Sequence, residues 1–159
     1  MEVTLHEQCY TNQNQQRVSE WRRALQELSQ EKGLRAKKEL LHPKLEIITR
    51  GDLGFTFRLQ GEGELAVNID VRKRHLQPHF ESYKEVIEHL LKPQLSTYGF
   101  EALDYGKKLA HDEAAEFLQA VLRDHIELEH ATARRLFTLL FLLGNDIPWA
   151  QIRMHPNNG

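Results

Sequence analysis

Three polar residues in the second half of the sequence, Arg123, Asp124 and His130, have types and a spacing that could serve catalysis. Periodic apolar residues predict one long helix from about residue 112 to residue 143. Residues seven apart on a helix are separated by about two turns and project from the same side. We therefore expect Arg123 and His130 to share one face of that helix.

The run of Arg123, the polar Asp124, five further residues and His130 resembles the active-site motif of HEPN-domain ribonucleases over eight residues. The resemblance implies metal-independent RNA cleavage, with Arg123 and His130 at the cleaving site and Asp124 as the polar motif residue. It also implies a site that is completed by dimerisation. The alternative is a solvated helix face on which Arg123, Glu127 and His130 form pairs within the helix.

The chain has nine histidines, and two pairs of residues have a spacing that suits metal ligands. Pro78 lies between His75 and His79 and predicts a loop there, which removes the helical reason for their spacing. Glu127 and His130 match the Glu-x-x-His pattern of di-metal helical bundles, but the sequence has no second such pattern. We predict no metal site and no cofactor.

Other catalytic signatures are missing from the sequence. It has no GxSxG, no P-loop, no GxGxxG after a strand and no His-Glu-x-x-His. The single cysteine, Cys9, cannot form an internal disulfide, and this fits a reducing compartment such as the cytoplasm. The sequence therefore favours a non-enzymatic protein over any enzyme class.

Basic residues gather in the first half of the chain, although the net charge is only −2. Residues 17–50 hold nine Lys or Arg and five Asp or Glu, whereas residues 80–130 hold five and eleven. This polarity indicates either two solvated faces of opposite sign or a basic surface for a polyanion or an acidic partner. The candidate polyanion-binding residues are Arg22, Arg23, Arg35, Lys37, Lys38, Arg72, Lys73 and Arg74.

The segment from Leu136 to Leu143 is apolar almost all round, although it is too short to span a membrane, which takes about 20 residues. A helix without a polar face is buried on every side. We expect it either in the core or in contact with a second copy of the protein. The candidate interface residues are Leu136, Phe137, Leu140 and Phe141.

The remaining patterns predict an α+β fold. Residues 1–16 are polar and are expected to form a flexible arm, with a short strand at residues 3–6, before a single α+β domain over residues 17–159. An apolar stripe predicts a helix over residues 17–32, and period-two alternation between residues 45 and 71 predicts a three-stranded antiparallel meander. A helical C-terminal half, with helices at residues 80–91 and 112–143 and a short one capped by Asp146, should pack on one face of the sheet.

These observations lead to two functional hypotheses. The first is a cytoplasmic, non-enzymatic interaction or regulatory protein, such as an adaptor, a chaperone or an inhibitor of a larger assembly. Its partner would be another protein, with a homodimer as a further alternative and no membrane contact. The second hypothesis is an RNA-binding protein or HEPN-like ribonuclease that uses Arg123 and His130.

Overall fold

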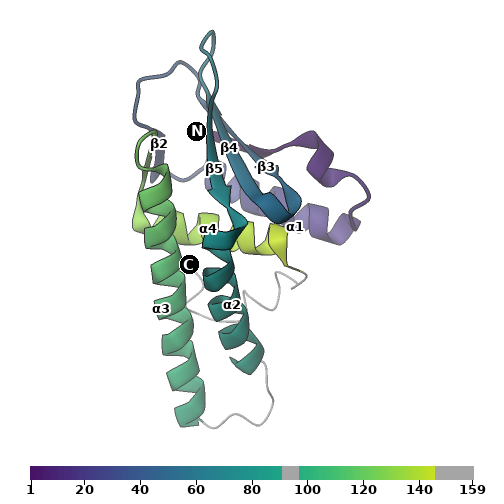
Figure 1. Cartoon of the computed structure of the whole chain (residues 1–159), viewed down its shortest axis with the longest axis vertical. Helices are drawn as coiled ribbons and strands as arrows, with labels where there is room; N and C mark the ends of the chain where they lie inside the picture. Colours follow the sequence, from purple (N-terminus) through teal and green to yellow (C-terminus); the bar gives the residue numbers. More distant parts are fainter. Residues whose placement is uncertain (91–96, 146–159) are drawn as a thin grey trace.

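The computed structural model describes residues 1–90 and 97–145 and shows an α+β fold, as predicted (Figure 1). Within these residues the chain forms four α-helices, a four-stranded sheet and a separate two-stranded sheet. The predicted arrangement differs from the observed one in detail, in the composition of the sheet and in the boundaries of the helices. The predicted helix after Asp146 lies outside the described residues.

The main sheet has the strand order β1-β3-β4-β5. Strands β3 (Lys44–Thr49), β4 (Gly54–Gln60) and β5 (Val67–Arg72) pair antiparallel, whereas β1 (Glu2–Leu5) pairs parallel to β3. Strand β1 corresponds to the short strand expected at residues 3–6 within the predicted arm, and it belongs to the main sheet. Its side chains Val3 and Leu5 are buried, and this burial outweighs the polar composition of the residues that follow.

Helix α1 (Gln15–Ser29) provides the crossover that a parallel pair of strands requires. It follows the short 3-10 helix η1 (Glu7–Tyr10) and begins where Asn14 Oδ1 accepts a hydrogen bond of 2.7 Å from the backbone N–H of Gln16. Trp21, Leu25 and Leu28 form its buried stripe, as the sequence pattern predicts.

The prediction of one long helix at residues 112–143 is wrong, because this segment contains parts of two helices with a strand between them. Helix α3 (Thr97–Leu122) ends in a turn, strand β6 (Ile126–Leu128) follows, and helix α4 (His130–Gly144) begins after it. Strand β6 pairs antiparallel with β2 (Leu34–Ala36), so that Leu128 lies opposite Leu34. This pairing buries Ile126 and Leu128, and local sequence patterns cannot reveal a partner that is so distant in the chain.

Helix α2 (Lys73–Leu90) also begins earlier than predicted. It follows β5 directly and contains Pro78, so the prediction of a loop between His75 and His79 is wrong. Pro78 lies in the second turn, where it removes one backbone hydrogen bond without ending the helix. The ring of His79 packs on that of Phe117 with 5.1 Å between the centroids, so this histidine lies between α2 and α3.

Helices α2 and α3 run side by side away from the sheet, and α4 crosses their upper part (Figure 1). The rings of Phe80, Tyr83, Phe137 and Phe141 meet in edge-on and tilted contacts between α2 and α4. At the far end of α4, Arg17 of α1 donates hydrogen bonds of 3.1 Å to the carbonyl oxygens of Leu142 and Asn145. One continuous core therefore joins the sheet to all four helices of the described chain.

The turn between β3 and β4, which contains the 3-10 helix η2 (Gly51–Leu53), lies at the end of the sheet nearest to α2. Gly54 has φ +117°, and a Cβ atom there would lie only 2.6 Å from the backbone nitrogen of Lys73. Only glycine fits this position, where β4 passes close to the start of α2. Of the helices that the structure describes, none is long and apolar enough to cross a bilayer.

Candidate functional site

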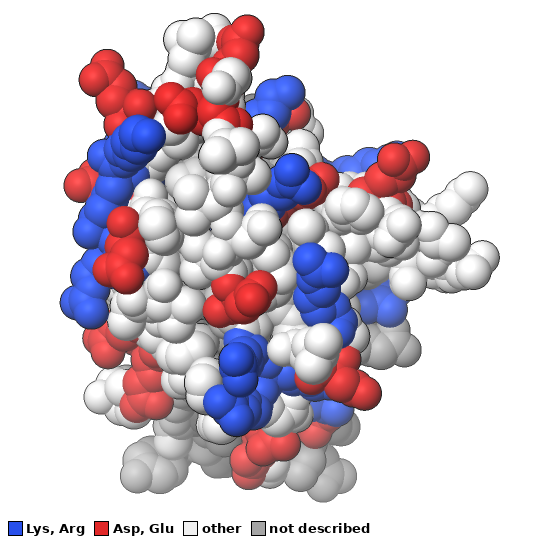
Figure 2. Space-filling view, turned by 45° about the horizontal axis from the view of Figure 1, so that its top comes forward, with Lys and Arg blue, Asp and Glu red and all other residues white. Residues whose placement is uncertain are grey.

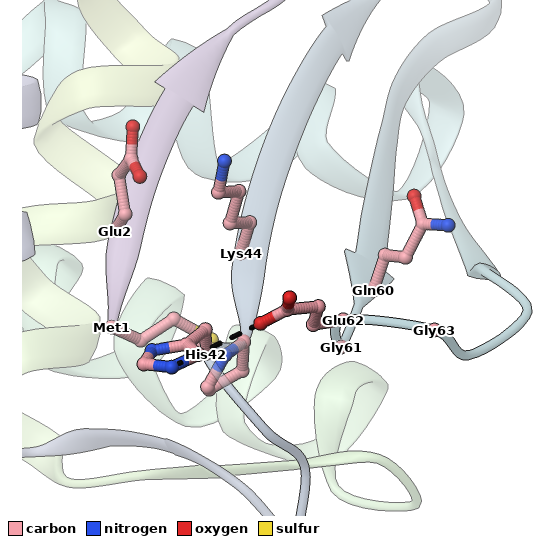
Figure 3. A pocket seen from close by; sticks show the side chains of 9 residues that line it. Met1, Glu2, His42, Lys44, Gln60, Gly61, Glu62 and Gly63 are labelled. Carbon is pink, nitrogen blue, oxygen red and sulfur yellow. Dashed lines mark ion pairs between the residues drawn. The ribbon is translucent and has the colours of Figure 1, made fainter.

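The opposite end of the sheet carries the clearest candidate site, which we call the loop-end site. It comprises the loop of residues 37–43 before β3, the loop of residues 61–66 after β4, and a pocket of about 850 Å³ beside them. Figure 3 shows the pocket at the ends of β1, β3 and β4, with His42 and Glu62 directed towards each other. Its described lining residues are Met1, Glu2, His42, Pro43, Lys44, Gln60, Gly61, Glu62 and Gly63.

The two loops of the loop-end site hold each other in place. The backbone N–H of Glu62 donates a hydrogen bond of 2.7 Å to the carbonyl oxygen of Leu41. Lys38 Nζ lies 3.7 Å from Glu64 Oε2, and Gln60 Nε2 donates to the carbonyl oxygen of Glu64 at 3.0 Å. These contacts give the loops a defined conformation before any partner is bound.

Two leucines of these loops are exposed to solvent. Leu65 is 93% exposed and Leu41 is 63% exposed, although leucine usually contributes to a core. Neither leucine lines the pocket, but each belongs to a loop that does, through His42 in the first loop and Glu62 in the second. Exposed apolar side chains near a concave pocket with charged groups are a common feature of binding surfaces.

The described pocket lining does not form a catalytic set. His42 Nε2 lies 3.9 Å from Glu62 Oε2, and both side chains are exposed, at 74% and 66%. Cysteine, serine and threonine are missing from the described lining, so the histidine has no hydroxyl or thiol there to activate. The described lining therefore holds no hydroxyl or thiol nucleophile beside His42.

The predicted catalytic residues do not share a helix face. Arg123 and Asp124 lie in the turn after α3, whereas His130 is the first residue of α4, beyond strand β6. The geometric premise of the HEPN-like motif is therefore wrong, because the intervening residues are extended. His130 Nε2 instead lies 3.0 Å from Asp112 Oδ1 of α3, and a hollow lined by Arg123 does not include His130 among its described residues.

Asp112 links His130 to Arg134, whose Nε lies 3.5 Å from the same Oδ1 atom. Partial burial raises the pKa of Asp112, but the hydrogen bond from His130 and the charge of Arg134 outweigh it and leave the pKa below its usual value. This carboxylate is therefore ionised at neutral pH and fastens α3 to the start of α4. The chemical role of Arg123 and His130 stays a prediction.

Several of the predicted polyanion-binding residues lie next to carboxylates. Arg23 contacts Glu27, Arg35 contacts both Glu127 and Glu129, Lys38 contacts Glu64 and Lys73 contacts Asp52. Arg22 lies over the ring of Tyr10, at 5.2 Å from its centroid. Figure 2 shows one face of the molecule, on which blue and red patches lie next to each other with white surface between them.

The predicted interface residues are core residues. Leu136, Phe137, Leu140 and Phe141 are each 0% exposed within a single chain. The apolar segment of α4 packs against α1, α2 and α3, and this packing buries its side chains within one chain, without a second copy. The prediction of an interface at these four residues is therefore corrected.

A buried polar cluster between α2, α3 and α4 was not predicted from the sequence. Tyr83, Lys107 and His111 are each 0% exposed, and Thr138 is 2% exposed. His111 Nε2 lies 2.8 Å from the carbonyl oxygen of Arg134 and 3.0 Å from Thr138 Oγ1. Within the described residues, Lys107 Nζ and His111 Nδ1 have no hydrogen-bond partner.

Burial controls the protonation of this cluster. It lowers the pKa of His111 to about 4 and that of Lys107 to about 8, and it raises the pKa of Tyr83. Asp104 opposes the shift of Lys107, and the hydrogen bond to Thr138 opposes that of Tyr83. Because these groups are enclosed by the three helices, a substrate cannot reach them in the observed conformation.

The signal for this cluster is present in the sequence. Lys107 and His111 continue the stripe of Ala114, Leu118 and Leu122 at helical spacing, and a polar residue on an apolar stripe is expected to be buried. By contrast, the candidate residues with metal-ligand spacing have no such support. Among the described residues, no group of three His, Cys, Asp or Glu is placed to hold a metal ion.

Comparison with known proteins identifies the family. The model of an uncharacterised protein family, UPF0262, matches residues 1–145, which include every described helix and strand. The chain belongs to this family. No solved structure matches the chain.

Curated UPF0262 proteins match over a shorter segment. A UPF0262 protein of Methylobacterium radiotolerans is 43% identical over 63 residues, which are 40% of this chain and 36% of that protein. A UPF0262 protein of Phenylobacterium zucineum is 44% identical over 63 residues, which are 40% of this chain and 36% of that protein. A UPF0262 protein of Brucella suis is 39% identical over 64 residues, which are 40% of this chain and 37% of that protein. The chain therefore matches little more than a third of the length of these relatives.

Proposed function

We propose that this UPF0262 chain is a non-enzymatic interaction protein that binds another protein through the loop-end site. The observation that carries the proposal is the exposure of Leu41 and Leu65 beside an open pocket. Apolar side chains that would each gain burial on association commonly anchor protein interfaces. The hydrogen bond between Glu62 and Leu41 supports this function, because it fixes both loops and lowers the entropic cost of binding.

The charges of the molecule favour a protein partner over a nucleic acid. Binding to a phosphate backbone depends on cations that are free to replace counterions. In this chain Arg35 and Lys38 lie within 4 Å of carboxylates, which would have to be displaced by phosphates. The pocket itself combines Glu2 and Glu62 with Lys44, so it suits a protein surface that carries both signs of charge around an apolar side chain.

The proposal can be tested by photo-crosslinking in cells. A photoreactive amino acid is placed at position 41 or 65 in the loop-end site, or at position 53 as a matched control. Leu53 is also exposed, at 77%, but it lies in η2 at the opposite end of β3 and β4. We expect the same protein to be captured from positions 41 and 65 and not from position 53.

Variants then connect the crosslink to affinity. Leu65→Asp and Leu41→Asp should weaken binding of the captured partner at least tenfold, because a charge would be buried at the contact, whereas Leu53→Asp should leave it unchanged. Equal capture from all three positions, or binding that survives both substitutions, would contradict the proposal. Capture of RNA at position 41 or 65 would replace it with the nucleic-acid hypothesis.

A further inference from the structure

The two edge strands of the main sheet, β1 and β5, differ in whether their outer backbone groups are hydrogen-bonded. At the β1 edge, Ser29 of α1 covers the backbone of Val3. The N–H of Val3 donates to Ser29 Oγ at 2.9 Å, and Ser29 Oγ also lies 3.4 Å from the carbonyl oxygen of Val3. The backbone groups of Val3 are therefore already paired and are not open to another strand.

The β5 edge has no such cover in the part of the chain that the structure describes. The strand pairs with β4 on one side, and neither its backbone nor its side chains make another hydrogen bond there, except that Asp70 accepts one from Thr56 at 2.7 Å. Asn68 and Asp70 are exposed, and Val67 and Ile69 are only half-buried. An unpaired row of N–H and C=O groups is a template for a further strand.

Strand β5 carries two exposed charged side chains, Asp70 and Arg72, but lacks the other features that usually protect an exposed edge. Its six residues, Val67–Arg72, contain no proline, no lysine and no bulge, and the register with β4 is unbroken from Val67 to Arg72. Apolar and polar side chains alternate along it. The edge is therefore straight, amphipathic and long enough to pair.

We propose that a second copy of this chain pairs at this edge, with β5 antiparallel to β5 of the second copy around a twofold axis. The two four-stranded sheets would become one continuous sheet. Such an interface is isologous, so each residue contact occurs twice. This inference is independent of the loop-end site and of the partner proposed for it.

Charge selects the register of this pairing. Residues opposite each other in an antiparallel pair lie on the same face, so only registers that keep apolar opposite apolar are allowed. Placing Asp70 opposite itself brings two carboxylates together, which is destabilising. Placing Ile69 opposite Ile69 of the second copy sets Asn68 against Asp70 of the second copy, where the amide can donate to the carboxylate.

The same register covers the half-buried apolar residues. Val67 would lie opposite Val71 of the second copy, and Ile69 would lie opposite its equivalent. A register centred on Val71 would pair Asp70 with Arg72 but would shorten the strand overlap, because α2 begins at Lys73. The register centred on Ile69 pairs five of the six strand residues, Val67 to Val71, and leaves no like charges opposed.

Opposite charge changes at Asn68 test the proposal, because this side chain is exposed and its replacement leaves the folded chain intact. Asn68→Asp places two carboxylates together twice and should raise the dimer dissociation constant about tenfold. Asn68→Lys faces Asp70 with a cation and should lower it about tenfold. Sedimentation equilibrium measures both, with Gln26→Glu and Gln26→Lys on the exposed side of α1 as controls that should change nothing.

A disulfide trap tests the register directly. In a Cys9→Ser background, Ile69→Cys should oxidise rapidly to a covalent dimer, because directly opposed residues of an antiparallel pair are about 4.5–5.5 Å apart at Cα. Leu53→Cys serves as the exposed control and should crosslink slowly. A chain that stays monomeric at millimolar concentration, or opposite variants at Asn68 that shift the equilibrium in the same direction, would overturn the proposal.

Discussion

The helical end and the loop end of this molecule place polar and apolar groups in opposite ways. Between α2, α3 and α4, the titratable side chains of Tyr83, Lys107 and His111 are fully enclosed. At the loop end, Leu41 and Leu65 are exposed beside a charged pocket. The titratable groups of the buried cluster are therefore closed to solvent, whereas the two leucines of the loop end are open to it.

The sharpest contrast between the two ends concerns stability. Phe141→Ala at the helical end should lower the free energy of unfolding by about 3–5 kcal/mol, because Phe141 is 0% exposed and contacts Phe80 and Tyr83. Leu65→Ala should change it by less than about 0.5 kcal/mol. Urea unfolding measures both values, and similar losses for the two variants would show that the loop end belongs to the core.

The pH dependence of stability should originate at the helical end. His111 has a folded-state pKa of about 4, below its value of 6.5 in the unfolded chain. The unfolded chain therefore binds more protons between these values, and roughly 3 kcal/mol of stability should be lost as the pH falls from 6.5 to 4.

His111→Leu should remove this part of the pH dependence, whereas His42→Gln at the exposed pocket should retain it. Unfolding by urea at several pH values between 4 and 8 gives the comparison. If the slopes of His111→Leu and the unmodified chain were the same, His111 would be accessible to water and the helical end would not be closed.

The smallest effect should be a gain of stability at Lys107. A buried ammonium without a hydrogen-bond partner in the described chain is costly, so Lys107→Met should stabilise the protein by roughly 1–3 kcal/mol at pH 7. The gain should shrink as the pH rises from 8 towards 10.5, because the lysine of the unfolded chain then loses its proton too. Lys108→Met, at an exposed neighbour, is the matched control, and a loss of stability only at position 107 would indicate a bound counter-group.

The sequence allows the central strands to be predicted better than the connections. Alternation between Leu45 and Leu59 is local and reports the buried face of β3 and β4 directly. The break at residues 123–129 is different, because Glu127 and Leu128 are good helix formers and β6 is stabilised by its pairing with the distant β2. For the same reason, the predicted approach of Arg123 and His130 was wrong.

The candidate site shows the same limit. The burial of Lys107 and His111 follows from their place on an apolar stripe, so a reader of the sequence can find them. The exposure of Leu41 and Leu65 cannot be found in this way, because it depends on how two loops from different parts of the chain pack together. Nor does the sequence reveal that Ser29 covers one sheet edge while the other is left open.

The pairing of Leu34 with Leu128 and the contacts of Arg17 with the end of α4 have a consequence for biosynthesis. The sheet and α1 leave the ribosome before α4, which packs against α1 and supplies many of the core side chains. Until residue 144 has emerged, their apolar faces lack cover, and a nascent chain in that condition is prone to aggregate. We therefore expect a chain that is released before α4 has been made to be a target for chaperones and proteases rather than a smaller stable domain.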